Sequence, residues 1–228
     1  MIVTTHQPIF LPWPGLFYKA SNSDCMVLLD DVQFPLGRGW VNRNRLKYKE
    51  GEMFLTVPVR KKGRAHQLIS GVEIFDETGW RAKHLETIYH CYCHAPYFKE
   101  YFSVIESIYA ANHFYLIDLN LELIKFFFQA LGMNKELYLL SELDCGGRAT
   151  DLIIDICKKL GADTYLNFPI AEKHLDLSLM ENSGIEHKRC NFKPPVYPQL
   201  WGEFIYNLSA LDMLFNCGEK SRDIICSA

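Results

Sequence analysis

Two things are scarce in this sequence of 228 residues, namely long apolar runs and net charge, and their scarcity excludes several classes of protein. No apolar stretch reaches the roughly 20 residues that span a bilayer. Met1 leads directly into a short apolar segment instead of a secretory leader. We therefore expect a cytoplasmic protein with no integral membrane segment. The net charge of −3 gives no general attraction to nucleic acid, so we expect no nucleic-acid partner.

The eight cysteines lack the spacing of a disulfide framework or a zinc site. They are scattered along the chain, and without a secretory signal we expect free thiols. Cys91, Cys93 and His94 lie close in sequence, but residues two apart on a helix point to different sides, and no second Cys/His pair has ligand spacing. The sequence therefore predicts no metal, and it identifies no cofactor. It also has no serine in a nucleophile elbow, which favours direct transfer over a covalent intermediate.

Short apolar strands alternate with helical segments along the chain, which predicts the α/β class with a mostly parallel, Rossmann-like sheet. The composition, 49% hydrophobic and 14% aromatic, is that of a well-packed globular protein. Between roughly residues 78 and 132 the apolar period becomes helical. We expect one domain over residues 1–228, with that segment as a helical insertion. The predicted strands include 2–5, 26–29, 53–59, 69–75, 137–141, 163–167 and 185–192.

The first thirty residues hold the strongest signal for a site. His6 and Gln7 follow the first strand, and Asp30 and Asp31 follow the second. The carboxyl ends of parallel strands share one edge of a sheet, where ligands bind, so we expect these four side chains to converge. Prolines at positions 8, 12 and 14 stiffen the loop after His6. We expect Gly15 to need its lack of Cβ where this loop turns into a helix.

A basic segment follows, with nine of the chain's 24 Lys and Arg residues between Arg38 and Arg64. It reads as a loop as far as the strand predicted at 53–59. Asn42, Arg43, Asn44 and Arg45 place forked cations among amides, which suits an anionic or sugar-like ligand. Phosphate binding fits this pattern, whereas no motif supports sequence-specific nucleic-acid recognition.

Two residues of the helical segment, Lys83 and His84, are open to two interpretations. Trp80 and His84 form an i, i+4 pair on an apolar stripe, which favours a core role. Both Lys83 and His84 have side chains that would also serve a site, and the spacing alone does not separate these roles.

Several motifs together resemble the WbqC-like family from residue 3 to about residue 218. The motifs are His6-Gln7-Pro8-x-Phe10-Leu11-Pro12-Trp13-x-Gly15-x-Phe17-x-Lys19, Leu29-Asp30-Asp31-Val32-Gln33-Phe34, Asn42-Arg43-Asn44, Thr56-Val57-Pro58-Val59, Trp80-x-x-Lys83-His84 and Leu208-Ser209-x-x-Asp212-x-Leu214-Phe215-Asn216-x-Gly218. The chain departs from the family pattern at Asn167-Phe168-Pro169, where a glycine-containing loop is expected, and at His174, where a tyrosine is usual. A bulkier loop there leaves a ligand less room.

The resemblance implies a role in bacterial surface polysaccharide, including O-antigen, and a glycine-transferase role has been proposed for a relative. The family has no settled reaction. Carried over to this chain, the implied functional positions are His6, Gln7, Asp30, Asp31, Asn42, Arg43, Asn44, Lys83, His84 and Asp212.

The leading hypothesis is a transferase that moves an aminoacyl group such as glycyl onto a small-molecule substrate, a nucleotide-linked or lipid-linked sugar. The hypothesis assigns catalytic roles to His6, Asp30, Asp31 and His84, with His6 or an aspartate as general base. It assigns substrate binding to Gln7, Asn42, Arg43, Asn44, Arg45, Lys83 and Asp212, with Arg43 and Arg45 on a diphosphate.

Two alternatives come from other classes. By fold-level analogy, a nucleotidyltransferase-like enzyme would bind ATP with magnesium at Asp30 and Asp31, although the second histidine of that motif is missing. A non-catalytic sugar-nucleotide binding protein would use the same crevice without turnover.

Overall fold

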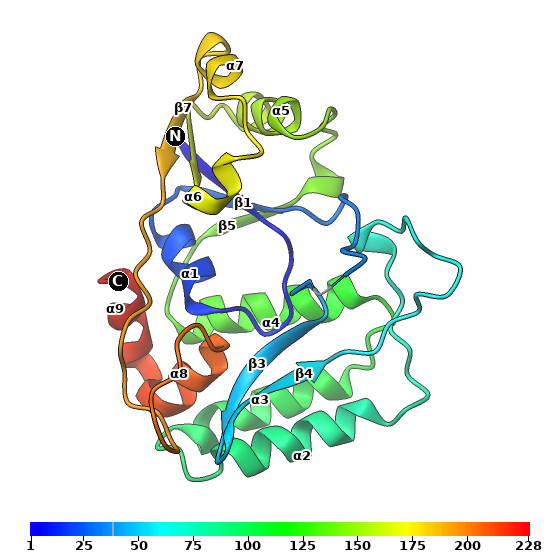
Figure 1. Ribbon diagram of the computed structural model, residues 1–228, viewed down its shortest axis with the longest axis vertical. Coiled ribbons are helices and arrows are strands. Elements are labelled where there is room, and N and C mark those ends of the chain that lie inside the picture. Colours follow the sequence, from blue (N-terminus) through cyan, green and yellow to red (C-terminus); the bar gives the residue numbers. More distant parts are fainter. Residues whose placement is uncertain (38) are drawn as a thin grey trace.

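A five-stranded, entirely parallel sheet forms the upper half of the molecule (Figure 1). The structure is a computed structural model that describes residues 1–37 and 39–228. Arg38, one of the cations of the basic segment, lies outside the described residues. The strand order is β5-β2-β1-β6-β7, and every neighbouring pair is parallel. The strands are β1 (Ile2–His6), β2 (Cys25–Leu28), β5 (Glu136–Leu139), β6 (Thr164–Asn167) and β7 (Glu186–Arg189).

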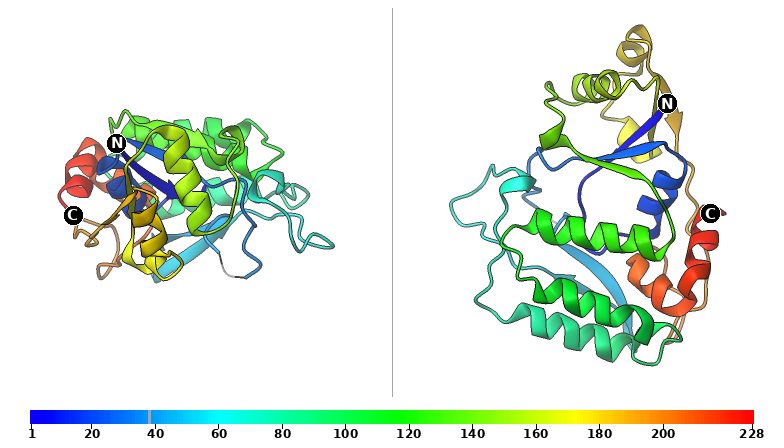
Figure 2. Two further views of the ribbon diagram at one scale, coloured as in Figure 1. Left: turned by 90° about the horizontal axis from the view of Figure 1, so that it is seen from above. Right: turned by 180° about the vertical axis from the view of Figure 1, so that it is seen from behind.

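The sheet is covered by helices on both faces, so its central strands are apolar on both sides. In β2 all four residues are buried, with Cys25 and Val27 in one core and Met26 and Leu28 in the other. The helices α5 and α7 lie over the first face, and α1 and α4 lie under the second (Figures 1 and 2). The predicted α/β class with a parallel sheet is confirmed.

Three helices between β4 and β5 account for the segment expected to be helical at about 78–132. They extend the lower core away from the sheet, and α4 separates the sheet from α2 and α3 (Figure 2, right). Gly132 follows α4 in the left-handed region, as its position predicts. The helices are α1 (Pro14–Ser21), α2 (Trp80–Tyr92), α3 (Phe98–Ala110), α4 (Leu116–Ala130), α5 (Thr150–Leu160), α6 (Pro169–Glu172), α7 (Leu177–Asn182), α8 (Ala210–Cys217) and α9 (Ser221–Cys226).

The strand order reverses at β1. From β1 the chain adds β2 and then β5 on one side, and it later returns to add β6 and then β7 on the other side. Loops that leave β1 and β6 therefore run in opposite directions and leave a crevice between them, which is where ligands bind in open α/β sheets. The topology places the crevice between β1 and β6, and the sequence-based expectation had placed it between β1 and β2.

The basic segment predicted as a loop is instead a strand. β3 (Arg43–Tyr48) pairs antiparallel with β4 (Gly51–Thr56), and the hairpin lies between α4 and α2 (Figure 1). The strand escaped prediction because its inward positions include Asn44, and Lys47 is buried as well, so the usual apolar alternation is absent. The strand predicted at 69–75 was also wrong. Residues Ile69–Gly71 form a 3-10 turn, and only isolated bridges follow.

Gly15 is required for a reason other than the backbone turn that the sequence suggested. It lies in the first turn of α1, and a Cβ there would come closer than 3.0 Å to the indole ring of Trp13.

We predict that Gly15→Ala lowers the free energy of unfolding by about 1–3 kcal/mol, because the indole must move. Urea denaturation measures this loss. Gly71→Ala is the control, since its Cβ would meet nothing within 4 Å, and an equal loss there would contradict the steric explanation.

Candidate functional site

A cleft of about 380 Å³ opens where β1 and β6 end. Its walls come from four parts of the chain: the end of β1 with the proline loop, the β3 strand with Trp40 shortly before it, the exit of β6, and a late loop. The lining residues are His6, Gln7, Ile9, Trp13, Trp40, Asn44, Arg45, Phe168, Ile170 and Asn207. The cleft therefore occupies the switch point that the strand order defines.

A second hollow of about 710 Å³ adjoins the first and shares Trp13, Phe168, Ile170 and Asn207 with it. Its remaining walls come from the segment after β7, including Phe192. The Trp13 ring lies 5.4 Å from the Phe168 ring and 5.3 Å from the Phe192 ring, measured between centroids. The two hollows form a continuous site with one aromatic half and one more polar half.

Buried amides fix the proline loop, residues 7–13. Nδ2 of Asn120 on α4 donates to the carbonyls of Pro8 and Val41, both at 2.8 Å. Nδ2 of Asn44 donates to the carbonyl of Leu11 at 2.7 Å and to that of Phe10 at 3.2 Å. Prolines remove backbone donors from this loop, so side-chain donors hold it by its carbonyls. Asn44 therefore lines the cleft and shapes it at once.

His6 lines the cleft as a neutral imidazole. Its Nδ1–H donates to the carbonyl of Gln7 at 2.8 Å, which assigns the proton to Nδ1 and leaves a lone pair on Nε2. Burial, and after it the charge of Lys19, lowers the pKa of His6 to about 3. At neutral pH the ring is an acceptor of hydrogen bonds and a very weak base.

Arg45 is the cation of the cleft. Its Nη1 is 2.6 Å from a carboxylate oxygen of Glu52, and its Nη2 donates to the carbonyls of Tyr206 and Asn207 at 3.3 and 2.9 Å. Its Cζ lies 5.7 Å from the centre of the Trp40 ring. Nε is buried, and among the described residues it has no hydrogen-bond partner. The guanidinium is thus held rigidly at the wall, with its Nε–H unused.

Lys19 lies beneath the cleft, and the sequence reasoning gave it no role. It is 3% exposed on the inner face of α1, and its Nζ donates to the carbonyl of Thr5 at 2.5 Å. Nζ also lies 5.0 Å from the centre of the Phe168 ring, which lines both hollows. The signal in the sequence was a lysine three residues after Leu16 and one before Ala20, on a stripe where an apolar residue is expected.

The two aspartates expected beside His6 do not line the cleft. Asp30 is 2% exposed and turns to the end of β5, where its carboxylate accepts from the backbone N–H of Ser141 at 3.0 Å and from its hydroxyl at 2.6 Å. Asp31 is exposed. β2 and β1 do end at the same edge, but the strand order places the cleft on the other side of β1. The predicted convergence of these aspartates with His6 is therefore corrected.

Five other predicted residues lie apart from the cleft lining, namely Asn42, Arg43, Lys83, His84 and Asp212. Asn42 donates from Nδ2 to the carbonyl of Val57 at 2.9 Å and so braces the hairpin. Arg43 donates from Nε to the carbonyl of Gly39 and covers the Phe54 ring, 4.7 Å from its centre. These side chains shape the wall that carries Trp40 and Arg45 without lining the cleft.

His84 is a core residue on α2, and Lys83 beside it is exposed. The His84 ring packs edge-on against Trp80 at 4.9 Å, and its Nδ1 lies 3.3 Å from the Tyr109 hydroxyl. Burial lowers the pKa of His84 to about 4, so it is neutral at pH 7. The i, i+4 pairing with Trp80 marks a packing stripe, and the catalytic role assigned to His84 is corrected.

Asp212 is fully buried in a polar network far from solvent. Its Oδ2 accepts from the Tyr92 hydroxyl at 2.8 Å, and that hydroxyl in turn accepts from the backbone N–H of Lys47 at 2.9 Å. Burial raises the pKa of Asp212 from 3.8 to about 6, opposed by hydrogen bonds from Tyr92 and Tyr197. The carboxylate joins α8 to α2 and β3, and it does not line the cleft.

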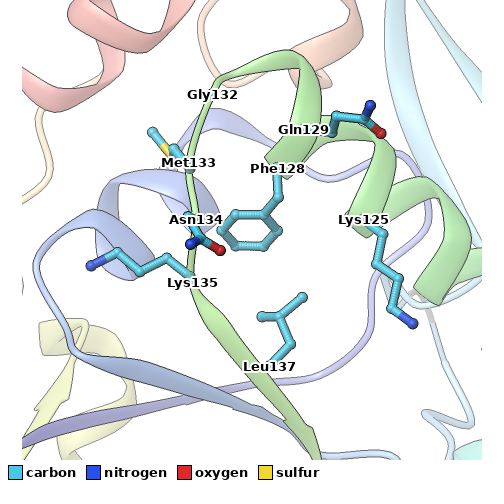
Figure 3. A pocket seen from close by; sticks show the side chains of 8 residues that line it. All are labelled: Lys125, Phe128, Gln129, Gly132, Met133, Asn134, Lys135 and Leu137. Carbon is cyan, nitrogen blue, oxygen red and sulfur yellow. The ribbon is translucent and has the colours of Figure 1, made fainter.

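Another hollow, of about 570 Å³, lies at the opposite end of β5 (Figure 3). Lys125 and Gln129 of α4 and Lys135 before β5 surround Phe128 there, with their polar ends directed outward. It is an open groove at the amino edge of the sheet, so it lacks the topological reason that supports the cleft. Within residues 1–37 and 39–228, no three His, Cys, Asp or Glu side chains are grouped as metal ligands.

The fold and the cleft together define an α/β protein with a crevice at the switch point of a parallel sheet. The chain belongs to the WbqC-like protein family, whose sequence profile matches residues 7–224. It is 30% identical over 221 residues to "Uncharacterized protein Rv1507c" of Mycobacterium tuberculosis (strain ATCC 25618 / H37Rv), and the match covers 96% of this chain and 95% of that protein. No solved structure matches the chain. No helix among the described residues is long and apolar enough to cross a bilayer.

Asp212 predicts a pH dependence of stability. Because folding raises its pKa, the stability contributed by the protonated carboxyl is complete below about pH 3.8 and is lost as the pH rises through about 6. Asp212→Asn cannot ionise. Its free energy of unfolding, relative to the natural chain, should therefore rise by about 2 kcal/mol between pH 4 and pH 7.

Urea denaturation at both pH values measures this difference. Asp118→Asn, at an exposed position in the first turn of α4, is the matched control and should follow the natural chain at both pH values. Parallel profiles for Asp212→Asn and the natural chain would show that folding does not change the pKa of Asp212.

Proposed function

We propose that this chain is a cytoplasmic transferase that acts on an activated sugar precursor of bacterial surface polysaccharide and transfers an aminoacyl group such as glycyl. The observation that carries the proposal is the composition of the cleft at the switch point. Aromatic faces, a rigid guanidinium and a neutral imidazole meet there, with the amides of Gln7, Asn44 and Asn207. Family membership supports the polysaccharide context.

The two halves of the site suit the two ends of a nucleotide-linked or lipid-linked sugar. The aromatic half, with Trp13, Phe168 and Phe192, offers ring faces and apolar surface for a base or a lipid chain. The polar half holds Arg45, whose planar fork matches phosphate oxygens, and amides that pair with sugar hydroxyls. Arg43 packs against Trp40 and does not line the cleft, so in this scheme Arg45 binds the diphosphate.

The chemistry expected in this cleft is direct acyl transfer. The acceptor oxygen or nitrogen forms a bond to the acyl carbon, the bond from that carbon to its donor group breaks, and the acceptor proton passes to the released donor group or to water. In this scheme Nε2 of His6 accepts a hydrogen bond from the acceptor group and so orients its lone pair. Because the pKa of His6 is only about 3, its contribution as a proton acceptor is small by Brønsted behaviour, and orientation is its main role.

The nucleotidyltransferase alternative loses its main support in this geometry. It relied on Asp30 and Asp31 as a magnesium pair, but both oxygens of Asp30 accept hydrogen bonds from Ser141. A non-catalytic sugar-nucleotide binding protein would use the same cleft, and a turnover measurement separates it from the transferase.

We predict that UDP-sugars bind the cleft and that Arg45→Gln weakens this binding by about 10- to 100-fold, the value of a charge-assisted hydrogen bond of 1.5–3 kcal/mol. Isothermal titration with a set of UDP-sugars measures the affinity. Glu52→Gln is the matched control, because it removes the ion pair of Arg45 and leaves the guanidinium in place.

If both variants lost affinity equally, Arg45 would act only by bracing the β3–β4 hairpin and not by contacting the ligand. Mass spectrometry of the UDP-sugar after incubation with aminoacyl donors then tests the transferase. Binding without any acylated product from any donor would favour the non-catalytic alternative.

A further inference from the structure

Lys19 is a buried lysine, and no carboxylate within residues 1–37 and 39–228 pairs with it. A buried lysine is rare in proteins unless it is paired, because desolvation disfavours its charge. Of the described residues only Cys190, with its thiol, is an ionisable group that raises the pKa of Lys19, and burial dominates, lowering this pKa from 10.5 to about 7. The amine makes one hydrogen bond, to the carbonyl of Thr5, and an ammonium has three N–H donors.

Lys19 packs beside Phe168, a side chain that lines both hollows, although Lys19 itself lines neither of them. It carries the charge that acts on His6, which lines the cleft, and on Cys190, which lines the adjoining hollow. The ring of Phe168 covers Nζ at 5.0 Å and is itself shared by both hollows. A rotation of this one side chain, which is part of the loop after β6, would open Nζ to a ligand in either half.

We propose that Lys19, as an ammonium, binds the diphosphate of the ligand at the junction of the two hollows. Arg45 contributes a second positive charge from the opposite wall. This inference rests on the proposed function for the source of the diphosphate. Lys19 acts by direct contact with phosphate oxygens, so it is a binding residue of the site.

The charged form of Lys19 gains a partner only when an anion is bound. In the free protein its amine is close to the balance between charged and neutral at pH 7, since burial lowers the pKa of Lys19 to about 7. A phosphate raises this pKa, so binding takes up a proton. The facing groups do not titrate between pH 6 and 9, because burial holds the pKa of His6 near 3 and that of Cys190 near 11. Arg45 stays charged throughout.

The test is the affinity for UDP-glucose between pH 6 and 9, measured by isothermal titration with the natural chain and Lys19→Met. Neither phosphate of this probe changes its charge in that range. We expect Lys19→Met to bind at least tenfold more weakly at pH 6 and to lose the decline in affinity that the natural chain shows as the pH rises. Lys188→Met, an exposed lysine of β7 outside both hollows, should match the natural chain.

Lys19→Met should fold, because methionine fills a similar volume and removes a desolvated charge. Lys19→Gln is the second variant. It retains an N–H donor toward the carbonyl of Thr5 but carries no charge, so it should show the same loss of affinity and of pH dependence. Equal affinity and an equal pH profile in these variants and the natural chain would overturn the proposal and leave the proposed function standing.

Two further probes separate the source of the phosphate. Geranyl diphosphate binding that depends on Lys19, with no binding of UDP-glucose, would indicate a lipid-linked substrate. Inorganic pyrophosphate binding that depends on Lys19, with neither organic probe bound, would keep the role of Lys19 and reject the sugar precursor. Failure of all three anions to bind the natural chain would overturn the role of Lys19.

Discussion

The candidate site depends on how the proline loop is held. A loop with few backbone donors cannot fix itself by turns of its own, so it must be held by its carbonyls. Asn120 and Asn44 supply that constraint from α4 and β3, and the backbone N–H of Ala210 completes it by donating to the carbonyl of Pro12 at 2.7 Å. Elements from three parts of the chain thereby position Trp13 and the end of β1. Buried side-chain amides that donate in this way favour one geometry, because any alternative leaves their N–H donors unpaired.

The electrostatics of the cleft differ from those of the crevices that commonly bind phosphate. Such crevices commonly expose cations to solvent and attract anions over a distance. Here Arg45 is braced by Glu52, Lys19 is covered by Phe168, and His6 is kept neutral. Neighbouring groups thus shield these cations, so they would attract an anion only at contact distance. This arrangement favours discrimination between ligands over rapid capture.

Much of the fold was predicted from the sequence, since short apolar segments that alternate with helical ones indicated a parallel sheet, and five of the predicted strands lie in that sheet. Of the hairpin only β4 was predicted, because in β3 the polar Asn44 and Lys47 are buried on opposite faces of the strand, which removes the usual apolar alternation. The site was predicted in part. His6 and Gln7 followed from their place after the first strand, but the partner of that strand across the cleft did not. Whether β2 or β6 supplies the opposite wall depends on strand order, which local patterns do not encode.

Lys19 illustrates the remaining gap. Its importance comes from the absence of a carboxylate around it, and an absence of that kind is a property of the packed structure. Family resemblance included Lys19 in the first motif but gave no reason for it, and the same resemblance gave Asp212 and His84 the same weight as His6. Geometry separates them: Asp212 and His84 join helices in the lower core, while Lys19 lies under the cleft.

The cleft joins both ends of the chain, and this has a consequence for synthesis. Thr5 meets Tyr165 across 160 residues, and Arg45 meets Asn207 across 162. The walls built from the proline loop and β3 contact each other early, but they meet the walls from the exit of β6 and the late loop only when the last third of the chain is in place. A ligand in this cleft can make all its contacts only with the fully folded chain. Its binding therefore stabilises the complete fold and not an incomplete nascent chain.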